Sequence, residues 1–552
     1  MSNLKTLYRK AVPAALLLLP LGYFLWSAQM VTFQAPPWWV AALGLGVLAL
    51  YSRRVPWPAW LYWGWGGITL LWSLAPGHTL VWTLWSIVFL AAMMAGRWLP
   101  GFWLLNLPLL FLGIDAGLLL YHFGYTTGEE PLFQYAYGAQ ALLLVPLLAV
   151  TTLKQGRNWT LVLLALLLSA ALFSTLISGA RAVYLPLLVV VMLGGYRIVR
   201  EGMDRKRILL AALVVVGSLA LVDGLLSYHP VRAALARNLV ATNQLIRSEE
   251  GGVGSRGFGT VEWRLRMWEQ TGDIALKRPF GAGAGSFPAV IHAYQQYPML
   301  WSNNPHNVLM ETLAQSGWVG LLLLLLLLGW PMIKVWPSGH WPFALAVGGF
   351  WSTFIFDIHT MSPAMMLVAF WSLGALWKLA EGEAPTVSRS VNVKPLGVVL
   401  AFGLVLWWYL PCQSDVCSVE RHLGHPEKVL PRLAEADPAS RDEVLEMARS
   451  LYPQSLWVLQ ADLLYAVQPE ERLRIIKETS LRFPFQHPRN YLRWAELASS
   501  LGKDDEVEEA ISLGLQYFPP DAKVNLGRRR GLTREAYDQL ITSLIANQMP
   551  QE

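Results

Sequence analysis

A polar segment that carries arginines and ends in a histidine separates long apolar runs in the first 411 residues. It contains Arg264-Leu-Arg-Met-Trp268, a Pro-x-Gly-x-Gly-x-Gly-x-Phe stretch over 279–287, and Asn304-Pro-His-Asn-Val308. Arginine offers a planar, permanently charged group that binds phosphate in a bidentate manner, and histidine titrates near neutral pH and can accept a proton. We therefore expect anion binding and proton transfer in this segment.

Local patterns place these residues on helices and in the loops between them. Residues 261–277 have apolar side chains at helical spacing, so Arg264 and Trp268 share one helix face. Asn307 begins the next helix and Pro305 suits its start, so His306 is expected near the first turn. Free backbone N–H groups and the helix dipole favour an anion there. The glycines of 279–287 either bring backbone close to a ligand or only form a loop.

The composition indicates a membrane protein that surrounds this segment. Of 552 residues, 54% are hydrophobic and only 14% are charged, whereas a soluble protein is about one quarter charged. The net charge of +6 comes from basic residues in short loops, which indicates membrane topology and not binding of nucleic acid. We predict thirteen spans, at 11–29, 36–51, 58–75, 79–96, 101–122, 136–153, 159–177, 181–198, 207–227, 307–330, 340–357, 362–380 and 394–411.

The distribution of lysine and arginine between the loops predicts the orientation. With the N-terminus in the cytoplasm, every predicted inner loop is basic and the short outer loops are poor in Lys and Arg. Residues 228–306, which start with an amphipathic helix over 228–250, and all residues after 411 then lie outside the cytoplasm. This topology brings five distant residues to the level of one membrane face, namely Arg181, Arg264, His306, Asp357 and His359.

The order of the short motifs resembles the O-antigen ligase and polymerase superfamily of bacterial inner-membrane glycosyltransferases, which have a GT-C-like fold. The matching pieces are R-L-x-M-W, P-x-G-x-G-x-G-x-F, and P-H-N-x-x-L followed by G-x-x-G and a long span. Ser178-Gly-Ala-Arg181 is similar to the family's S-x-S-R signature with altered serine spacing, and 356–363 is similar to D-x-x-L-x-x-P. The resemblance covers roughly residues 170–370.

The resemblance implies transfer of a glycan from undecaprenyl pyrophosphate to an acceptor hydroxyl. In that reading Arg181 and Arg264 hold the diphosphate and stabilise its departure, and His306 takes the proton of the attacking hydroxyl. The acceptor is a lipid A core sugar in ligases, a growing glycan in polymerases and a protein side chain in O-oligosaccharyltransferases. The outer loops contain neither a Walker loop nor an Asp-x-Asp pair, in agreement with a lipid-linked donor and transfer without a metal or cofactor.

Further residues are expected to bind the donor or the acceptor. They are Arg266, Trp268, Asn307, Asp357 and His359. Simpler roles compete with these: an arginine at a span end can be a lipid anchor, a carboxylate can cap a helix, and a lone histidine can be an interfacial residue. The membrane lipids themselves are expected partners of the apolar spans.

The chain after residue 411 forms a second predicted domain, 412–552, beside the transmembrane domain 1–411. Tyr452-Pro453, Phe483-Pro484 and Phe518-Pro519 recur at spacings of 31 and 35, a period that resembles tetratricopeptide repeats. We predict helices at 426–436, 439–451, 455–467, 469–482, 487–500, 504–517 and 533–547. Stacked repeats bind a protein partner on a concave face, but a plain helical cap over the membrane part fits as well. Cys412 and Cys417 form a local disulfide or stay as thiols.

The predicted fold class is therefore all-α: a polytopic membrane protein of the bacterial inner membrane with a large periplasmic loop and a periplasmic helical domain. Two other classes of function compete with glycan transfer. A transporter needs charges at mid-membrane and often inverted repeats, and the spans show neither. A scaffold that gathers envelope proteins through the repeats would not depend on His306.

Overall fold

A computed structural model describes the chain over 55–98, 181–225, 260–356, 363–382, 438–453, 455–521 and 534–548, with scattered helical positions between 139 and 172. Several predictions fall outside these residues. They are the spans at 11–29, 36–51, 101–122 and 394–411, the helices at 228–250 and 426–436, and the residues Asp357, His359, Cys412 and Cys417.

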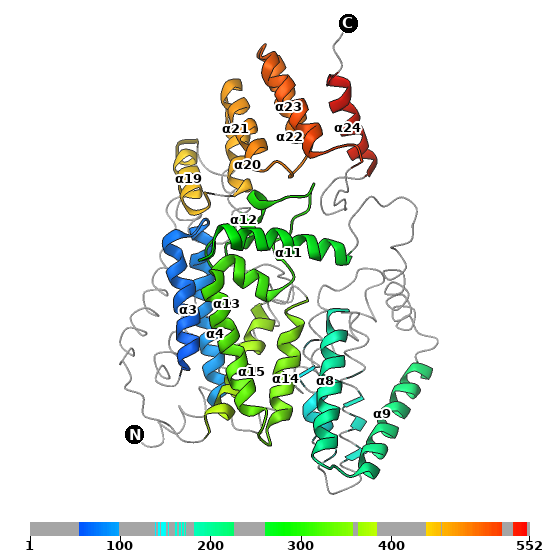
Figure 1. Ribbon diagram of the computed structural model, residues 1–552. Helices are drawn as coiled ribbons and strands as arrows, with labels where there is room; N and C mark the ends of the chain where they lie inside the picture. The colour runs from blue at the N-terminus through cyan, green and yellow to red at the C-terminus, as the bar shows by residue number, and fades with distance from the viewer. Residues whose placement is uncertain are drawn as a thin grey trace, which may run out of the picture.

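Within the described residues the chain forms helices and no strands, and the long apolar helices run side by side in the lower part of Figure 1. They are α3 (Trp57–Ile68), α4 (Pro76–Trp98), α8 (Arg181–Arg200), α9 (Arg205–Leu225), α13 (Val308–Val335), α14 (Trp341–Thr353) and α15 (Pro363–Glu381). Three described segments are long and apolar enough to cross a membrane, Pro76–Met94, Val183–Arg200 and Val308–Val335. The predicted class, an all-α polytopic membrane protein, is confirmed.

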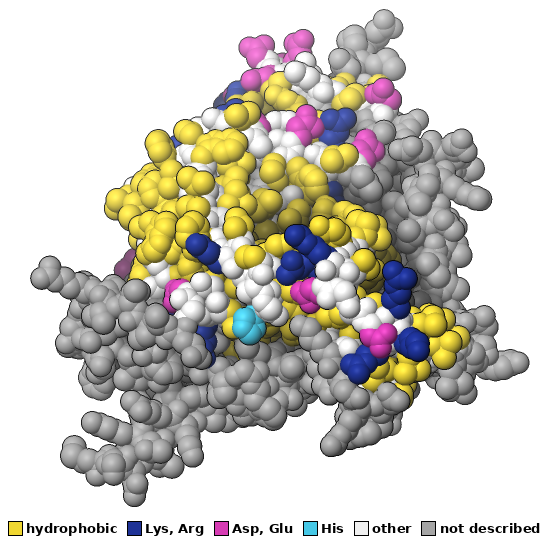
Figure 2. Space-filling model, turned by 60° about the horizontal axis from the view of Figure 1, so that its bottom comes forward, with side chains coloured by type: hydrophobic (Ala, Val, Ile, Leu, Met, Phe, Trp, Pro, Cys, Tyr) yellow, Lys and Arg dark blue, Asp and Glu magenta, His cyan; other side chains and the backbone are white. Residues whose placement is uncertain are grey.

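The surface of this bundle suits lipid. Large apolar side chains on its helices are exposed, among them Leu185, Val199, Leu213, Leu322 and Ile333. Figure 2 shows a broad hydrophobic surface, with charged side chains gathered toward the end of the bundle that faces the viewer. Exposed apolar area of this extent would be costly in water, so hydrocarbon is the solvent that explains it.

Two predicted spans are interrupted. The span expected at 58–75 is helical only to Ile68 and continues as a 3-10 turn, η2 (Thr69–Trp72), before α4 begins. At 1.5 Å per residue the 12 residues of α3 cover only ~18 Å. The span expected at 307–330 is broken at Gly317, which has φ 69° and ψ −169° inside α13. Both breaks lie where a loop of distant sequence inserts its backbone, as described below.

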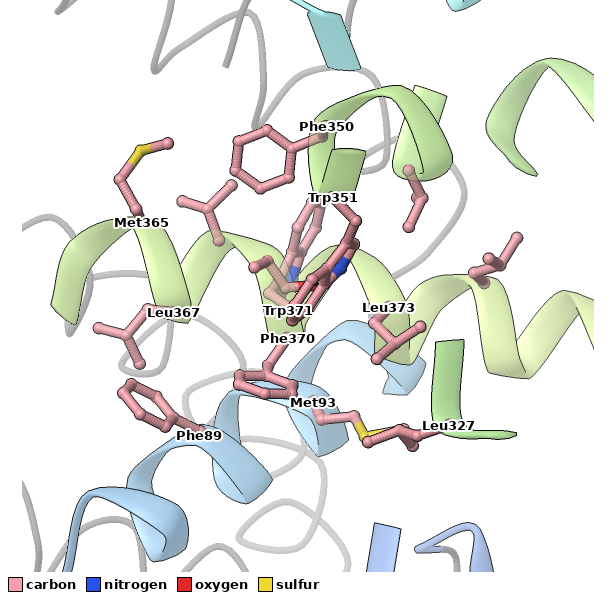
Figure 3. Packing of buried hydrophobic residues seen from close by; sticks show 14 of the residues in the cluster. Phe89, Met93, Leu327, Phe350, Trp351, Met365, Leu367, Phe370, Trp371 and Leu373 are labelled. Carbon is pink, nitrogen blue, oxygen red and sulfur yellow. The ribbon is translucent and has the colours of Figure 1, made fainter. Parts of the chain in front are cut away.

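The bundle core is centred on the crossing of α4 and α15. Phe370 of α15 stacks on Phe89 of α4 with ring centroids 5.5 Å apart and meets Trp351 of α14 edge-on at 5.3 Å (Figure 3). Gly96 and Gly374 lie directly against backbone carbonyls of the opposite helix, where a Cβ atom would not fit. Small residues that allow backbones to approach closely are typical of helix contacts in membranes.

A second layer crosses one end of the bundle. In Figure 1, α11 (Thr260–Lys277) runs across the ends of the long helices, followed by α12 (Phe287–Val290) and the 3-10 turn η4 (Ile291–Tyr294). The hydrophobic cluster beneath it includes Met267, Ile274, Phe287 and Leu300. This layer contains most of the residues to which the sequence assigns chemistry.

The C-terminal helices form a third layer beyond it (Figure 1). They are α19 (Pro438–Leu451), α20 (Leu456–Tyr465), α21 (Pro469–Arg482), α22 (Arg489–Ser500), α23 (Asp504–Tyr517) and α24 (Arg534–Gln548), and the six described helix predictions agree with them within a few residues. Tyr452, Phe483 and Phe518 each follow directly on a helix end and are buried. The recurring aromatic–proline pairs thus mark equivalent helix ends, while the tetratricopeptide assignment stays a prediction.

Candidate active site

The start of α13 is closed by its own cap. Asn307 is extended, with φ −159° and ψ 110°, and its Oδ1 accepts from the backbone N–H groups of Leu309 at 2.9 Å and Met310 at 3.2 Å. The N–H of Val308 donates to the carbonyl of Phe354 at 2.8 Å. The prediction that free N–H groups here bind an anion is therefore wrong, because protein acceptors already use them. Asn307 acts as a helix cap.

His306 lies directly before this cap in an uncommon backbone conformation. Its φ is 56°, in the left-handed region that non-glycine residues rarely adopt. The N–H of His306 donates to Asn304 Oδ1 at 2.6 Å, and the imidazole meets the Trp263 ring edge-on at 5.0 Å. A strained residue persists only where its surroundings hold it, and such residues cluster at functional sites.

A chain of side-chain hydrogen bonds holds the His306 turn. Asn304, fully buried, donates through Nδ2 to Glu311 Oε2 at 2.9 Å. Gln315 donates through Nε2 to Glu311 Oε1 at 3.1 Å, and its own Oε1 accepts from the N–H of Gly285 at 2.9 Å. Sequence reasoning missed Asn304, Glu311 and Gln315 as supporting residues. The available signal was the spacing of four between Glu311 and Gln315, which puts both on one face of α13.

α11 supports the same turn from the other side. Trp268 donates its indole N–H to the carbonyl of Pro305 at 2.9 Å, one residue before His306. Gln270 donates to the carbonyl of Leu300 at 3.3 Å and accepts from the N–H of Gln296 at 2.7 Å. Trp268, predicted as a ligand-binding residue, thus holds the backbone of the His306 segment.

The two arginines of α11, Arg264 and Arg266, differ in their hydrogen-bond partners. Arg266 donates to Glu269 at 3.0 Å and to Tyr297 at 2.8 Å, and Tyr297 in turn donates to Glu269 at 2.7 Å. The hydrogen bonds from Tyr297 and Arg266 lower the pKa of Glu269, so this exposed cluster stays an ion pair. Arg264 is partly buried and makes no hydrogen bond or ion pair with another described residue. It follows Trp263 and lies one turn before Trp268, so it flanks the His306 turn.

Arg181 belongs to the same end of the molecule. Near the C-terminal end of α8, Arg197 donates to the carbonyl of Trp336 at 3.2 Å, just beyond the end of α13. The 20 residues of α8 extend ~30 Å back from there toward the start of α13. The start of α8 therefore lies on the side of the bundle toward the start of α13, as Figure 1 shows. The side chain of Arg181 is outside the described part, as are Asp357 and His359.

Comparison with known families matches residues 163–325 to the O-antigen ligase family. This match supports the O-antigen ligase superfamily for the segment. Arg181, Arg264, His306 and Glu311 all lie inside the matched range, and the C-terminal helices lie outside it. The match supports a glycosyltransferase-like activity in O-antigen or polysaccharide processing, with a lipid-linked glycan donor and an acceptor. Comparison with curated proteins gave no match, and neither did comparison with solved structures.

The glycine loop of the matched segment, residues 279–287, binds protein backbone. The N–H groups of Ala282 and Gly283 donate at 2.9 Å to the carbonyls of Ala314 and Gln315, which the break at Gly317 leaves free. Gly317 and Gly281 have φ values of 69° and 88°. They lie so close that a Cβ atom on either one would meet the backbone of the other segment. The glycines therefore fasten the end of α11 to α13, and the prediction that they bring backbone to a ligand is not supported.

Proposed function

We propose that the chain transfers a glycan from an undecaprenyl-pyrophosphate-linked donor to an acceptor hydroxyl, as an O-antigen ligase does. The observation that carries the proposal is the place of Arg264 on α11, between Trp263, which meets the His306 ring edge-on, and Trp268, which donates to Pro305. The Arg264 guanidinium makes no ion pair with a described residue, and His306 is held in a left-handed turn. The site would face the periplasm at the bacterial inner membrane, with the N-terminus in the cytoplasm and residues 412–552 as a periplasmic domain.

The proposed reaction is a displacement at the anomeric carbon of the donor. The acceptor oxygen forms the new glycosidic bond while its proton passes to the His306 imidazole, and the bond from the anomeric carbon to the diphosphate oxygen breaks. Undecaprenyl pyrophosphate leaves with the electron pair. Arg264 and Arg181 stabilise the charge that develops on the diphosphate, because guanidinium groups bind phosphate oxygens in pairs.

The other predicted site residues take supporting parts in this proposal. Trp268 and Asn307 hold the His306 turn through Pro305 and the first turn of α13. Arg266, already paired with Glu269, contributes to the surface charge beside the site and not to the diphosphate clamp. Asp357 or His359 is proposed to orient the histidine or hold the acceptor. Phe354, shortly before them, accepts from Val308 at the start of α13, which favours a place near the site.

The identity of the acceptor distinguishes a ligase from other enzymes that use the same donor. A polysaccharide polymerase or a protein O-oligosaccharyltransferase would use the same donor and the same residues. The layer of paired C-terminal helices favours the protein-acceptor version to the extent that it offers a surface for a protein. A lipid-linked glycan transporter or a scaffold would release no undecaprenyl pyrophosphate.

The test is a transfer assay with the purified full chain in lipid nanodiscs. The protein is given a glycan on undecaprenyl pyrophosphate together with a lipid A core glycolipid, a free glycan or a serine-containing peptide, and mass spectrometry identifies the product. Formation of one glycosylated acceptor with equimolar undecaprenyl pyrophosphate supports the proposal. Movement of the intact donor across the bilayer without bond cleavage would show a transporter instead.

A further inference from the structure

The C-terminal helices are docked on the segment that leads to His306. The turn between α21 and α22, residues 483–487, presents the carbonyl of Phe485, which accepts from the N–H of Met299 and from Gln295 Nε2, both at 2.8 Å. His292 Nδ1 and Gln486 Oε1 form a third hydrogen bond across this junction, at 3.0 Å. The turn is itself fixed from within, because the Tyr491 hydroxyl donates to the carbonyl of Pro484 at 3.1 Å.

Met299 extends the junction into the core of the C-terminal helices. Its side chain is 2% exposed and belongs to the same hydrophobic cluster as Tyr491, Phe518 and Leu544. The other buried members of that cluster all come from residues 473–544. One side chain of the layer over the bundle is thus packed as a core residue of the C-terminal layer, so the two layers cannot shift apart without exposing it.

The segment from Met299 to His306 carries backbone strain at both ends. Among the described non-glycine residues, Met299 and His306 are the two with positive φ, at 54° and 56°. The C-terminal layer holds the Met299 end. At the other end, Trp268 of α11 holds Pro305 and Glu311 of α13 holds Asn304. A strained segment keeps its conformation only while both of its ends are held.

We propose that the C-terminal helices are a positioning element of the transfer reaction, with Met299 as the residue that connects them to His306. This inference rests on the proposed function. Met299 acts through the backbone of 299–306 and does not touch substrate. Loss of its anchor lets the His306 turn relax, which lowers the rate of proton transfer while binding of donor and acceptor is retained.

The experiment compares two cavities in one hydrophobic cluster. Met299→Ala removes the anchor but keeps the Cβ, so the cost of the positive φ is unchanged. Leu544→Ala opens a cavity on α24, in the same cluster but outside the segments 292–299 and 483–487 that form the junction. We expect Met299→Ala to lower kcat by about 10- to 100-fold, since a shift of about 1 Å in a catalytic group has such an effect. We expect KM for both substrates to stay within about threefold of wild type, because a loss of geometry that matters only in the transition state lowers kcat and not substrate binding.

Two further variants and the control complete the test. Met299→Leu keeps a large apolar anchor and is expected to restore kcat to within about threefold, because volume-conserving core changes are tolerated. Gln295→Ala, which removes one bond to Phe485, is expected to lower kcat by about fivefold, the size of one hydrogen bond. Leu544→Ala is expected to lower the Tm as much as Met299→Ala does and to leave the kcat of the folded protein unchanged.

Equal loss of kcat in Met299→Ala and Leu544→Ala, in proportion to the folded fraction, would overturn the inference. Wild-type kcat in Met299→Ala would do the same. His306→Ala, assayed beside them, separates the two proposals. An inactive His306 variant with a fully active Met299→Ala means that only the positioning role fails, whereas a fully active His306 variant removes the catalytic assignment itself.

Discussion

The His306 turn and the glycine loop are both polar, irregular segments at the same end of the bundle, yet they are built in opposite ways. The His306 turn is held by side chains, from Asn304, Glu311 and Trp268, and its imidazole meets the ring of Trp263, the residue before Arg264. The glycine loop is packed backbone against backbone on α13, because the N–H groups of Ala282 and Gly283 donate to α13 carbonyls and Gly281 lies in direct contact with Gly317. A substitution in a turn that is fixed by side chains can change its geometry without unfolding it. A side chain added where two backbone segments touch, as at Gly281 and Gly317, forces them apart. We therefore expect changes in the first region to affect rate and changes in the second to affect folding.

The largest effect is expected from His306→Ala. Loss of a general base lowers kcat by about 10²- to 10⁴-fold, and removal of a ring that is only partly buried should leave the Tm near that of wild type. The measurement is the initial rate of glycan transfer beside a thermal unfolding curve. His340→Ala is the matched control, since this exposed histidine lies at the far end of α13 and should be silent in both.

Gly281→Ala should show the opposite pattern. The new Cβ would meet the carbonyl of Gln315, and alanine is strained at φ 88°. We expect a loss of about 3 kcal/mol or more in the free energy of unfolding, as for other mutations that force backbone apart. Unfolding in detergent and the yield of inserted protein measure it. A folded Gly281→Ala protein that is merely slow would contradict the distinction between the two regions.

The Glu311–Gln315 pair offers a test by exchange. Glu311 now accepts hydrogen bonds from two side-chain amides, those of Asn304 and Gln315. Glu311→Gln places its own NH₂ group against one of these two donors. We expect kcat to fall by about tenfold, the cost of one unsatisfied polar contact. The double variant Glu311→Gln, Gln315→Glu rebuilds the chain from Gly285 to Asn304, because each position again faces a complementary partner. Recovery to within about threefold of wild type is expected in a double-mutant cycle. Additive losses would show that the network does not position His306.

Trp268→Phe should have the smallest effect. It removes the hydrogen bond to Pro305 and keeps most of the ring packing, a change of about 1 kcal/mol or roughly fivefold in kcat. The measurements are kcat and KM for donor and acceptor, and a rise in KM with unchanged kcat would indicate a direct contact with substrate instead. Trp318→Phe, at an exposed indole on α13, is the control.

Local patterns were enough to predict most helices but not the way they meet. The ranges of α8, α15 and α21 follow from apolar periodicity, and the place of His306 follows from Pro305 and Asn307. The short α3 and the break at Gly317 did not follow, since both depend on contacts with 279–285 from far along the chain. The prediction of an anion site at the start of α13 was wrong for a related reason. Whether a helix end has free N–H groups depends on the cap and on the distant Phe354 carbonyl, which no local pattern reports.

The choice between Arg264 and Arg266 shows the same limit from the functional side. Both lie on α11 two residues apart, and only the positions of Glu269 and Tyr297 show that Arg266 is already paired. Glu269 lies three residues from Arg266, a spacing that favours the pair, but Tyr297 comes from the following loop. The sequence thus indicated the segment, and the packing distinguishes its two arginines.

The most direct measurement of the central claim compares Arg264→Ala with Arg266→Ala in a single-turnover assay of undecaprenyl pyrophosphate release. We expect Arg264→Ala to slow release by at least about 10²-fold, as when one donor to a developing oxyanion is removed, and Arg266→Ala to stay within about threefold of wild type. Equal rates in the two variants, or a larger loss in Arg266→Ala, would contradict the assignment of the diphosphate clamp to Arg264.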